Sequence, residues 1–232
     1  MDNEYYILDK GGRIGPFTPR ELMARPLEPG DLLLQPSQTQ GVPAYSLPEF
    51  DSYFKSEGIY YPTQQNTNSY MLRLPAAIID FFVLAIPLWI LACILFPQYI
   101  LSLQPDITST KISYQQLMQK SAENMLKHQT EFFIIEVAFF LVTILYNTLC
   151  EASHLRASVG KYLLGLAVVD ELGYSLTFLH ALKRNLGKFI YEVASFFISI
   201  LAYTAYSRMI WSDRHQAFHD MFSGCYIVKK NQ

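Results

Sequence analysis

The sequence predicts two domains of different classes, a small α+β domain followed by an all-α membrane domain that crosses the bilayer more than once. Hydrophobic residues make up 51% of the 232 residues, but they are concentrated in the last two thirds of the chain. Three apolar runs there are each roughly 19 to 23 residues long, enough for a helix to cross a hydrocarbon core of about 30 Å. The polar, aperiodic stretch before the first run is typical of a flexible linker. We therefore expect a folded domain at 1–54, a linker at 55–70 and a transmembrane domain at 71–232.

The first domain is predicted to begin with a strand, a tight turn and a returning strand, at 5–9, 10–12 and 13–17. Thr18 and Glu21 have the spacing of a capping box, with Pro19 at the first helical position, so a short helix should follow. The remaining expected elements are a strand at 31–34 and a last helical turn from residue 47, packed by Phe50, Tyr53 and Phe54.

The first apolar run, at about 74–96, carries two charged side chains near its start. Arg73 stands at its entrance, and Asp80 lies inside it, at a depth where acidic residues are costly and usually face a protein interior. A spacing of seven places both on one helix face. They nevertheless lie about 10 Å apart along the axis, and the side chain of Arg73 leans away from Asp80. We therefore expect no direct bond between them, and each should meet a partner from later in the chain.

The second apolar run, at 132–150, supplies the polar groups expected to meet Asp80. It carries Glu136 near its start and Asn147 near its end, and Glu151 lies just beyond it. If the first two apolar helices are antiparallel, Asn147 and Glu151 reach the depth of Asp80, whereas Glu136 lies toward the opposite end. The sequence therefore predicts a polar cluster of Asp80, Asn147 and Glu151 at one membrane interface.

Between and after these runs, the patterning predicts helices that lie along the membrane surface. Apolar and polar side chains recur at helical spacing over 114–127, in the loop after the first run. Residues 175–188 repeat the pattern, with leucines opposite basic side chains that snorkel, as in an interfacial helix. A short strand is expected at 166–170, and the third apolar run covers 189–210.

The distribution of basic residues predicts how the protein is oriented in the membrane. They are most frequent between the second and third runs, at Arg156, Lys161, Lys183, Arg184 and Lys188. The positive-inside rule puts this side, together with the N-terminal domain, in the cytoplasm of a multi-pass inner-membrane protein. The third run either crosses once or returns. We favour a return, because it keeps the basic tail inside and allows 226–228 to pair with 166–169.

Several functional classes are not expected. The formal net charge of −2 and the lack of a block of Lys and Arg argue against nucleic-acid binding. Gly160-Lys161 lacks the other residues of a phosphate-binding loop. His215 and His219 stand four residues apart, but no third metal ligand is set by spacing. No nucleophile, base and orienting group form a catalytic pattern, so we predict neither an enzyme nor a bound cofactor or metal.

A set of aromatic, glycine and proline residues spans the first domain. Its members are Tyr5, Tyr6, Gly15, Pro16, Phe17, Glu21, Leu22, Val42, Pro43 and Ala44. With this set, residues 4–54 resemble the bacterial GYF-like domain, which implies binding of a proline-rich peptide of a partner protein, with Tyr6, Pro16 and Phe17 as candidate contacts. Leu34 and Gly41 stand where that family often has tryptophans. The alternative is that the aromatic side chains of so small a domain form its core.

A second set of residues spans the helical part of the chain. Its members are Arg73, Asp80, Gly160-Lys161, Gly165-Leu166, Val168-Val169-Asp170, Arg184-Asn185 and Asp220. With this set, residues 71–230 resemble the RDD family of membrane proteins, named for one arginine and two aspartates. The resemblance implies a polytopic membrane domain, and transport, including cation/proton exchange, is suggested for some members.

Two functions follow from these resemblances. The first is a transporter, or a transporter subunit, for cations, protons or another small ligand, with an intramembrane polar network. The network residues are Arg73, Asp80, Asn147, Glu151 and Asp220. The alternative is a non-catalytic membrane scaffold, in which these side chains fix the packing and residues 1–54 recruit a protein partner. The lipid bilayer is a partner in both cases, and the substrate and oligomeric state are left open.

Overall fold

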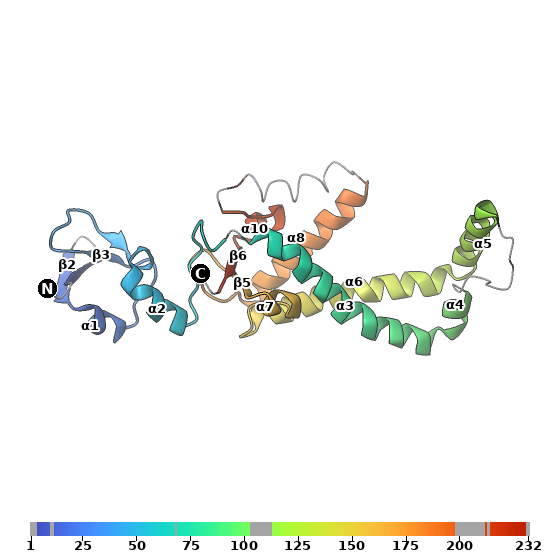
Figure 1. Ribbon diagram of the computed structural model, residues 1–232, viewed down its shortest axis with the longest axis horizontal. Coiled ribbons are helices and arrows are strands. Elements are labelled where there is room, and N and C mark those ends of the chain that lie inside the picture. The colour runs from blue at the N-terminus through green and yellow to red at the C-terminus, as the bar shows by residue number, and fades with distance from the viewer. Residues whose placement is uncertain are drawn as a thin grey trace.

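The computed structural model describes residues 4–9, 12–67, 69–102, 113–197, 212 and 214–230. The chain is elongated, with the N-terminal domain at one end and the helices α4 (Pro97–Ser102) and α5 (Tyr114–Lys127) at the other (Figure 1). Between them lies a compact unit of helices and two short strands, which we call the central unit. It comprises α7 (Val159–Leu163), β5 (Leu166–Val169), α8 (Phe178–Phe197), α10 (Phe218–Phe222) and β6 (Tyr226–Lys229), together with the adjoining ends of two long helices, α3 (Tyr70–Leu95) and α6 (Gln129–Ala152).

The N-terminal domain is a four-stranded antiparallel sheet with strand order β2-β1-β3-β4, flanked by short helices. Its elements are β1 (Tyr5–Asp9), β2 (Gly12–Phe17), α1 (Pro19–Met23), β3 (Leu32–Leu34), β4 (Val42–Pro43), the 3₁₀ turn η1 (Ala44–Ser46) and α2 (Pro48–Ser56). The capping box is present, because the Glu21 N–H donates to Thr18 Oγ1 at 3.3 Å and the Glu21 carboxylate accepts from the Thr18 N–H at 2.8 Å. The strands and the capped helix predicted here are confirmed.

The aromatic side chains of this domain are divided between core and surface. Tyr5 and Phe50 are fully buried and meet edge to face, with ring centroids 5.7 Å apart. Tyr6 and Phe17 are half-buried, and Pro16 is exposed. Tyr5 therefore belongs to the core, whereas Tyr6, Pro16 and Phe17 keep accessible surface.

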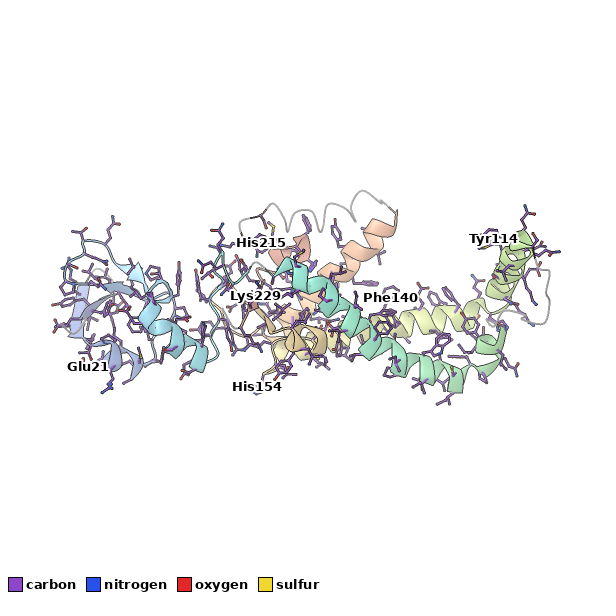
Figure 2. The ribbon with its side chains drawn as sticks, viewed as in Figure 1. Glu21, Tyr114, Phe140, His154, His215 and Lys229 are labelled. Atoms are coloured by element: carbon purple, nitrogen blue, oxygen red, sulfur yellow. The ribbon has the colours of Figure 1, made fainter. Side chains whose placement is uncertain are left out.

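Two helices of the described residues are long and apolar enough to cross a membrane, α3 (Tyr70–Leu95) and α6 (Gln129–Ala152). They run antiparallel (Figure 1). Few side chains in their most apolar windows are buried inside the protein, so both helices present apolar surface outward. Figure 2 marks the two ends of this helix pair. His154 and Lys229 lie at the central unit, and Tyr114 lies at the far end.

The central unit is built around a two-stranded sheet. β5 (Leu166–Val169) pairs antiparallel with β6 (Tyr226–Lys229), with Val168 opposite Ile227. This confirms the predicted pairing and brings the C-terminal strand back to the end of α6. The helices around the sheet are α7 (Val159–Leu163), α8 (Phe178–Phe197) and α10 (Phe218–Phe222).

Helix α8 differs from the prediction. The sequence separates an interfacial helix at 175–188 from an apolar run at 189–210, but the structure has one continuous helix over 178–197. Basic residues interrupt the hydropathy without interrupting the helix, because Lys and Arg are good helix formers. The remainder of the third apolar run, at 198–210, and its predicted return lie outside the described residues.

The described residues near the end of the segment predicted as a flexible linker form a turn and contacts to β6. The Thr63 N–H donates to Asn66 Oδ1 at 2.8 Å and the Asn66 N–H donates to Thr63 Oγ1 at 3.2 Å, which closes a turn. Buried Ser69 donates to the backbone carbonyl of Ile227 at 3.1 Å. The Lys229 N–H donates to the carbonyl of Asn66 at 2.9 Å. Polar side chains of this segment therefore cap a turn and contact β6.

The N-terminal domain rests on a turn of the central unit. The Tyr60 N–H donates to the carbonyl of Gly173 at 3.0 Å, and Tyr174 packs against the core of the N-terminal domain. Gly173 has a φ of +88°, and a Cβ there would lie 2.6 Å from the carbonyl carbon of Tyr60, so glycine permits this close approach. Arg156 adds a hydrogen bond to the carbonyl of Gly58.

Candidate functional site

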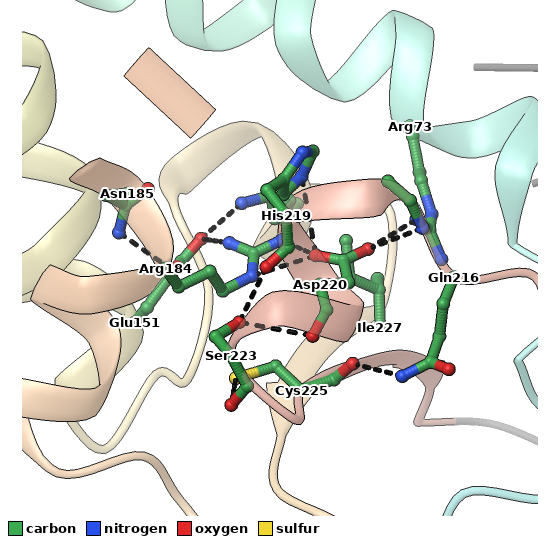
Figure 3. A network of polar contacts seen from close by, with 12 residues as sticks. Arg73, Glu151, Arg184, Asn185, Gln216, His219, Asp220, Ser223, Cys225 and Ile227 are labelled. Carbon is green, nitrogen blue, oxygen red and sulfur yellow. Dashed lines mark hydrogen bonds and ion pairs between the residues drawn. The ribbon is translucent and has the colours of Figure 1, made fainter. Parts of the chain in front are cut away.

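Buried charged side chains form a continuous network in the central unit (Figure 3). Asp220, fully buried on α10, lies at its centre. Its Oδ1 accepts from Arg184 Nε at 2.9 Å and Nη2 at 2.6 Å, and its Oδ2 accepts from Arg73 Nη1 at 2.9 Å. The Ala217 N–H also donates to Oδ2 at 3.2 Å, which fixes the carboxylate at the start of α10.

Glu151, fully buried near the end of α6, extends the network. Its Oε1 accepts from Arg184 Nη1 at 2.6 Å and from Lys161 Nζ at 2.5 Å. Its Oε2 accepts from Asn185 Nδ2 at 3.1 Å. Arg184 therefore bridges the two carboxylates. We call the whole set the charge chain; in order of contact it consists of Arg73, Asp220, Arg184, Glu151 and Lys161.

The charge chain joins five helices, since its members come from α3, α10, α8, α6 and α7 in turn. Taking such charges out of water costs several kcal/mol per ion, so each charge needs close partners. Among the described residues, every buried side-chain nitrogen and oxygen atom has a hydrogen-bond partner. The buried polar atoms of the charge chain are therefore all hydrogen-bonded, and positively and negatively charged side chains alternate along it.

Burial and the neighbouring charges of the charge chain set the protonation states of Asp220 and His219, which lie outside the two long apolar helices. Burial alone would raise the pKa of Asp220, but Arg184 and Arg73 hold that pKa well below its usual range. Burial lowers the pKa of Lys161, an effect that Glu151 opposes. Burial also lowers the pKa of His219, beside Asp220, to about 4. Near neutral pH, Asp220 is therefore ionised and His219 is neutral.

Asp80 forms a separate site between α3 and α7. Its Oδ1 accepts from the Tyr146 hydroxyl at 2.9 Å and from the Gly160 N–H at 2.7 Å. Its Oδ2 accepts from the Ser158 hydroxyl at 2.5 Å. The Asp80 residue is only 8% exposed. These three donors are neutral, in contrast to the cations of the charge chain.

Gly160 allows α7 to reach Asp80. A Cβ at this position would lie 2.1 Å from the carbonyl oxygen of Ala76 and 3.1 Å from Asp80 Cγ. A larger residue would push α7 away from α3 and take two of the three donors with it. The physical requirement at Gly160 is thus close packing of two helices.

The structure separates the three residues predicted to cluster. Asp80 contacts α7, Glu151 belongs to the charge chain, and Asn147 donates to the carbonyl of Thr143 at 2.9 Å, one turn earlier on α6. The direct pairing of Asp80 with Asn147 and Glu151 is therefore wrong, because α7 occupies the place beside Asp80. Arg73 and Asp80 meet different partners from later in the chain, in agreement with the prediction that they do not bond to each other.

Arg184 is the main residue that sequence reasoning missed as a site residue. The pattern puts it with Lys183 on the polar face of an interfacial helix, but it is only 2% exposed and meets two carboxylates. Ala181 and Asn185 are buried beside it. The spacing of 181, 184 and 185 carried the signal, because residues three and four apart share one helix face.

His215 and His219 do not share a helix. His215 precedes α10 with a φ of 47°, and its backbone carbonyl accepts from Arg73 Nη2 at 2.8 Å. His219 lies on α10. In the part of the chain that the structure describes, no group of three His, Cys, Asp or Glu side chains is placed to hold a metal ion.

A family model described as the RDD family matches residues 67–224, more than half of the chain. The matched segment begins just before α3 and ends after α10, so it contains both the charge chain and the Asp80 site. The N-terminal domain lies outside it. No curated protein and no solved structure matches the sequence.

Proposed function

The chain belongs to the RDD family, and from this premise we propose that it is a non-catalytic, multi-pass membrane scaffold that presents its N-terminal domain to a protein partner. The closed pairing of the charge chain carries this proposal. Asp220 accepts from two arginines, and Glu151 accepts from an arginine and a lysine. These carboxylates are occupied by fixed cations, so their main effect is to specify how the helices pack.

We place the central unit and the N-terminal domain on the cytoplasmic side of the inner membrane. Support comes from α3 and α6, which are long enough to span and expose apolar surface. The basic residues between α6 and α8 lie toward the central unit, and the positive-inside rule assigns that side to the cytoplasm. The pairing of β5 with β6 keeps the C-terminal strand on the same side.

The proposed recruiting surface lies on the N-terminal sheet. β2 is an edge strand, and its Ile14 and Pro16 are exposed. Phe17, at the end of β2, lies under the Arg25 guanidinium, 4.1 Å from the ring centroid. Exposed edges and proline- or aromatic-rich surfaces are usual sites for extended peptides. The hydrogen bond from the Tyr60 N–H to the carbonyl of Gly173 supports a fixed position of this surface relative to the central unit.

Site-specific photocrosslinking tests this proposal. A benzophenone amino acid at Ile14, in the full-length protein in its native membranes, should give a discrete product with one partner protein. The matched control is the same amino acid at Glu57, which is also exposed but lies at the end of α2. Identical products from both positions, or none from Ile14, would count against recruitment through this surface.

Asp80 favours transport as a second candidate function. Its hydrogen-bond donors among the described residues are a phenol, an alcohol and a backbone amide, and none of them carries a compensating charge. A buried acid inside an apolar span is a common proton- or cation-binding group in transporters. In this second candidate function, Asp80 binds the transported ion and the charge chain holds the surrounding helices in place.

Proton flux across proteoliposomes separates the two candidates. Under the scaffold proposal, the purified wild type and Asp80→Asn should both show only the background rate of protein-free liposomes under a Na⁺ or K⁺ gradient. Gradient-driven flux in the wild type that is lost in a folded Asp80→Asn variant would instead establish transport. Circular dichroism of both proteins provides the folding control.

A further inference from the structure

Helix α8 exposes one apolar stripe that contains a single lysine. The stripe consists of Leu179, Lys183, Leu186, Ile190 and Val193, all exposed. Their spacing of three and four residues places them on one face of the helix. Leu179 is 75% exposed and Ile190 is 66% exposed, so this face is not covered by the described part of the protein.

Helix α10 widens this apolar surface. The Phe218 ring lies 5.8 Å from the Tyr191 ring on α8, and a Cβ on Gly187 would lie 3.4 Å from the Phe222 ring. Both phenylalanines therefore pack on α8, yet Phe222 remains 61% exposed. Met221 is exposed beside them. We call the stripe and these three α10 side chains the α8–α10 surface.

Lys183 is the cation of this surface. Its Nζ lies 4.9 Å from the centroid of the Phe222 ring, within the range of a cation–π contact. Among the described residues, no carboxylate forms an ion pair with Lys183. Its alkyl stem shares a helix face with apolar side chains while the ammonium group stays available to an anion.

The charge chain sets the level of the α8–α10 surface relative to the membrane. Arg73 lies in the first turns of the apolar helix α3 and binds Asp220 on α10. Helix α10 therefore lies at the level where that candidate span begins. Helix α8 starts in the same central unit and packs against α6, the second candidate span (Figure 1). The α8–α10 surface therefore lies beside the end of α3 that carries Arg73 and beside α6.

We propose that the α8–α10 surface lies at the boundary between lipid headgroups and acyl chains, and that Lys183 there binds the phosphate of an anionic phospholipid while Phe222 packs on its acyl chains. The inference rests on the membrane insertion proposed above. An amphipathic helix with apolar and basic side chains is the usual element at this boundary. A basic side chain close to an anionic leaflet enriches anionic lipid by about fivefold.

Quenching of tryptophan by brominated lipids tests the placement. Single-tryptophan forms of the full-length protein are reconstituted into phosphatidylcholine vesicles brominated near the headgroup end of the acyl chains. Phe222→Trp, with Trp89 and Trp211 replaced by phenylalanine, should be strongly quenched. Ile14→Trp in the same background should keep its fluorescence, because Ile14 lies on the N-terminal sheet. A form with native Trp89 alone reports insertion of α3.

The lipid preference is tested in mixed vesicles in which either phosphatidylglycerol or phosphatidylcholine carries the bromine, at equal mole fraction. Brominated phosphatidylglycerol should quench Phe222→Trp more, equivalent to about fivefold enrichment. Lys183→Gln should abolish this preference, and Lys55→Gln on the N-terminal domain should leave it unchanged.

Each failure has a distinct meaning. If Trp89 is quenched but Phe222→Trp is not, insertion holds and the placement of the α8–α10 surface is overturned. If neither is quenched, membrane insertion fails as well. Equal quenching by the two lipids, or a preference that survives Lys183→Gln, overturns the phosphate site.

Discussion

Replacing Arg184 with glutamine should lower the free energy of unfolding by about 3 to 5 kcal/mol. Arg184 donates from Nε, Nη1 and Nη2 to Glu151 and Asp220, and it is only 2% exposed. Glutamine removes the shared cation and leaves each buried carboxylate one cation of the charge chain, Lys161 for Glu151 and Arg73 for Asp220. The loss is measured by titrating the protein in mixed micelles with SDS and following circular dichroism.

The neighbouring residue supplies the matched control. Lys183→Gln is the same kind of charge removal one position earlier on α8, but Lys183 is exposed and loses only its contact with the Phe222 ring, so the expected loss is at most about 1 kcal/mol. Arg184→Lys should fall between the two, because it keeps the charge and loses the forked geometry. Equal losses from Arg184→Gln and Lys183→Gln would contradict a structural role for the charge chain.

Elements of the fold were predictable where one physical signal dominated. The capping box at Thr18 and Glu21 and the pairing of β5 with β6 are examples. The boundary within α8 was not, because hydropathy reports preference for lipid and not the continuity of the backbone helix. The folded segment around Asn66 was missed because mobile linkers and capped turns share the same polar composition.

For the candidate site, the sequence predicted only the depth of each residue along its helix, and not its neighbours on other helices. Arg73 and Glu151 stood out because charged groups in or beside apolar segments require partners, whereas Asp220 was indicated only by the family resemblance. Depth along a helix gives a single coordinate, however, and the lateral neighbour depends on how short helices pack. Asp80 therefore meets Ser158 at the start of α7 instead of Asn147 at a similar depth. No periodicity in the apolar runs carries that information.

These two contact systems divide the packing of the domain between them. The charge chain connects α3 to α10, α8, α6 and α7 through ions, whereas the Asp80 site connects α3 to α7 through neutral donors and a close backbone approach. The first depends on charge and the second on shape. A substitution that changes only shape should therefore disrupt the second directly.

Gly160→Ala is that substitution, and it should lower the free energy of unfolding by about 4 kcal/mol. The added methyl group would lie 2.1 Å from the Ala76 carbonyl oxygen, which belongs to the backbone of α3 and cannot rotate away. Overpacking of this kind costs about 1 to 3 kcal/mol. Separation of α7 from α3 also weakens the bonds that Gly160 and Ser158 donate to Asp80, each worth about 1.5 to 3 kcal/mol.

Gly187→Ala should instead raise the free energy of unfolding, so the two variants are expected to change stability in opposite directions. Gly187 also lies in a helix, but a Cβ there would meet only the ring of Phe222 at 3.4 Å. Helix propensity should therefore act alone and stabilise the protein by up to about 1 kcal/mol. Both variants are compared with the wild type in the same SDS titration. If Gly160→Ala were neutral or stabilising, the close approach of α7 to α3 would not exist in the folded protein, and Asp80 would need other partners.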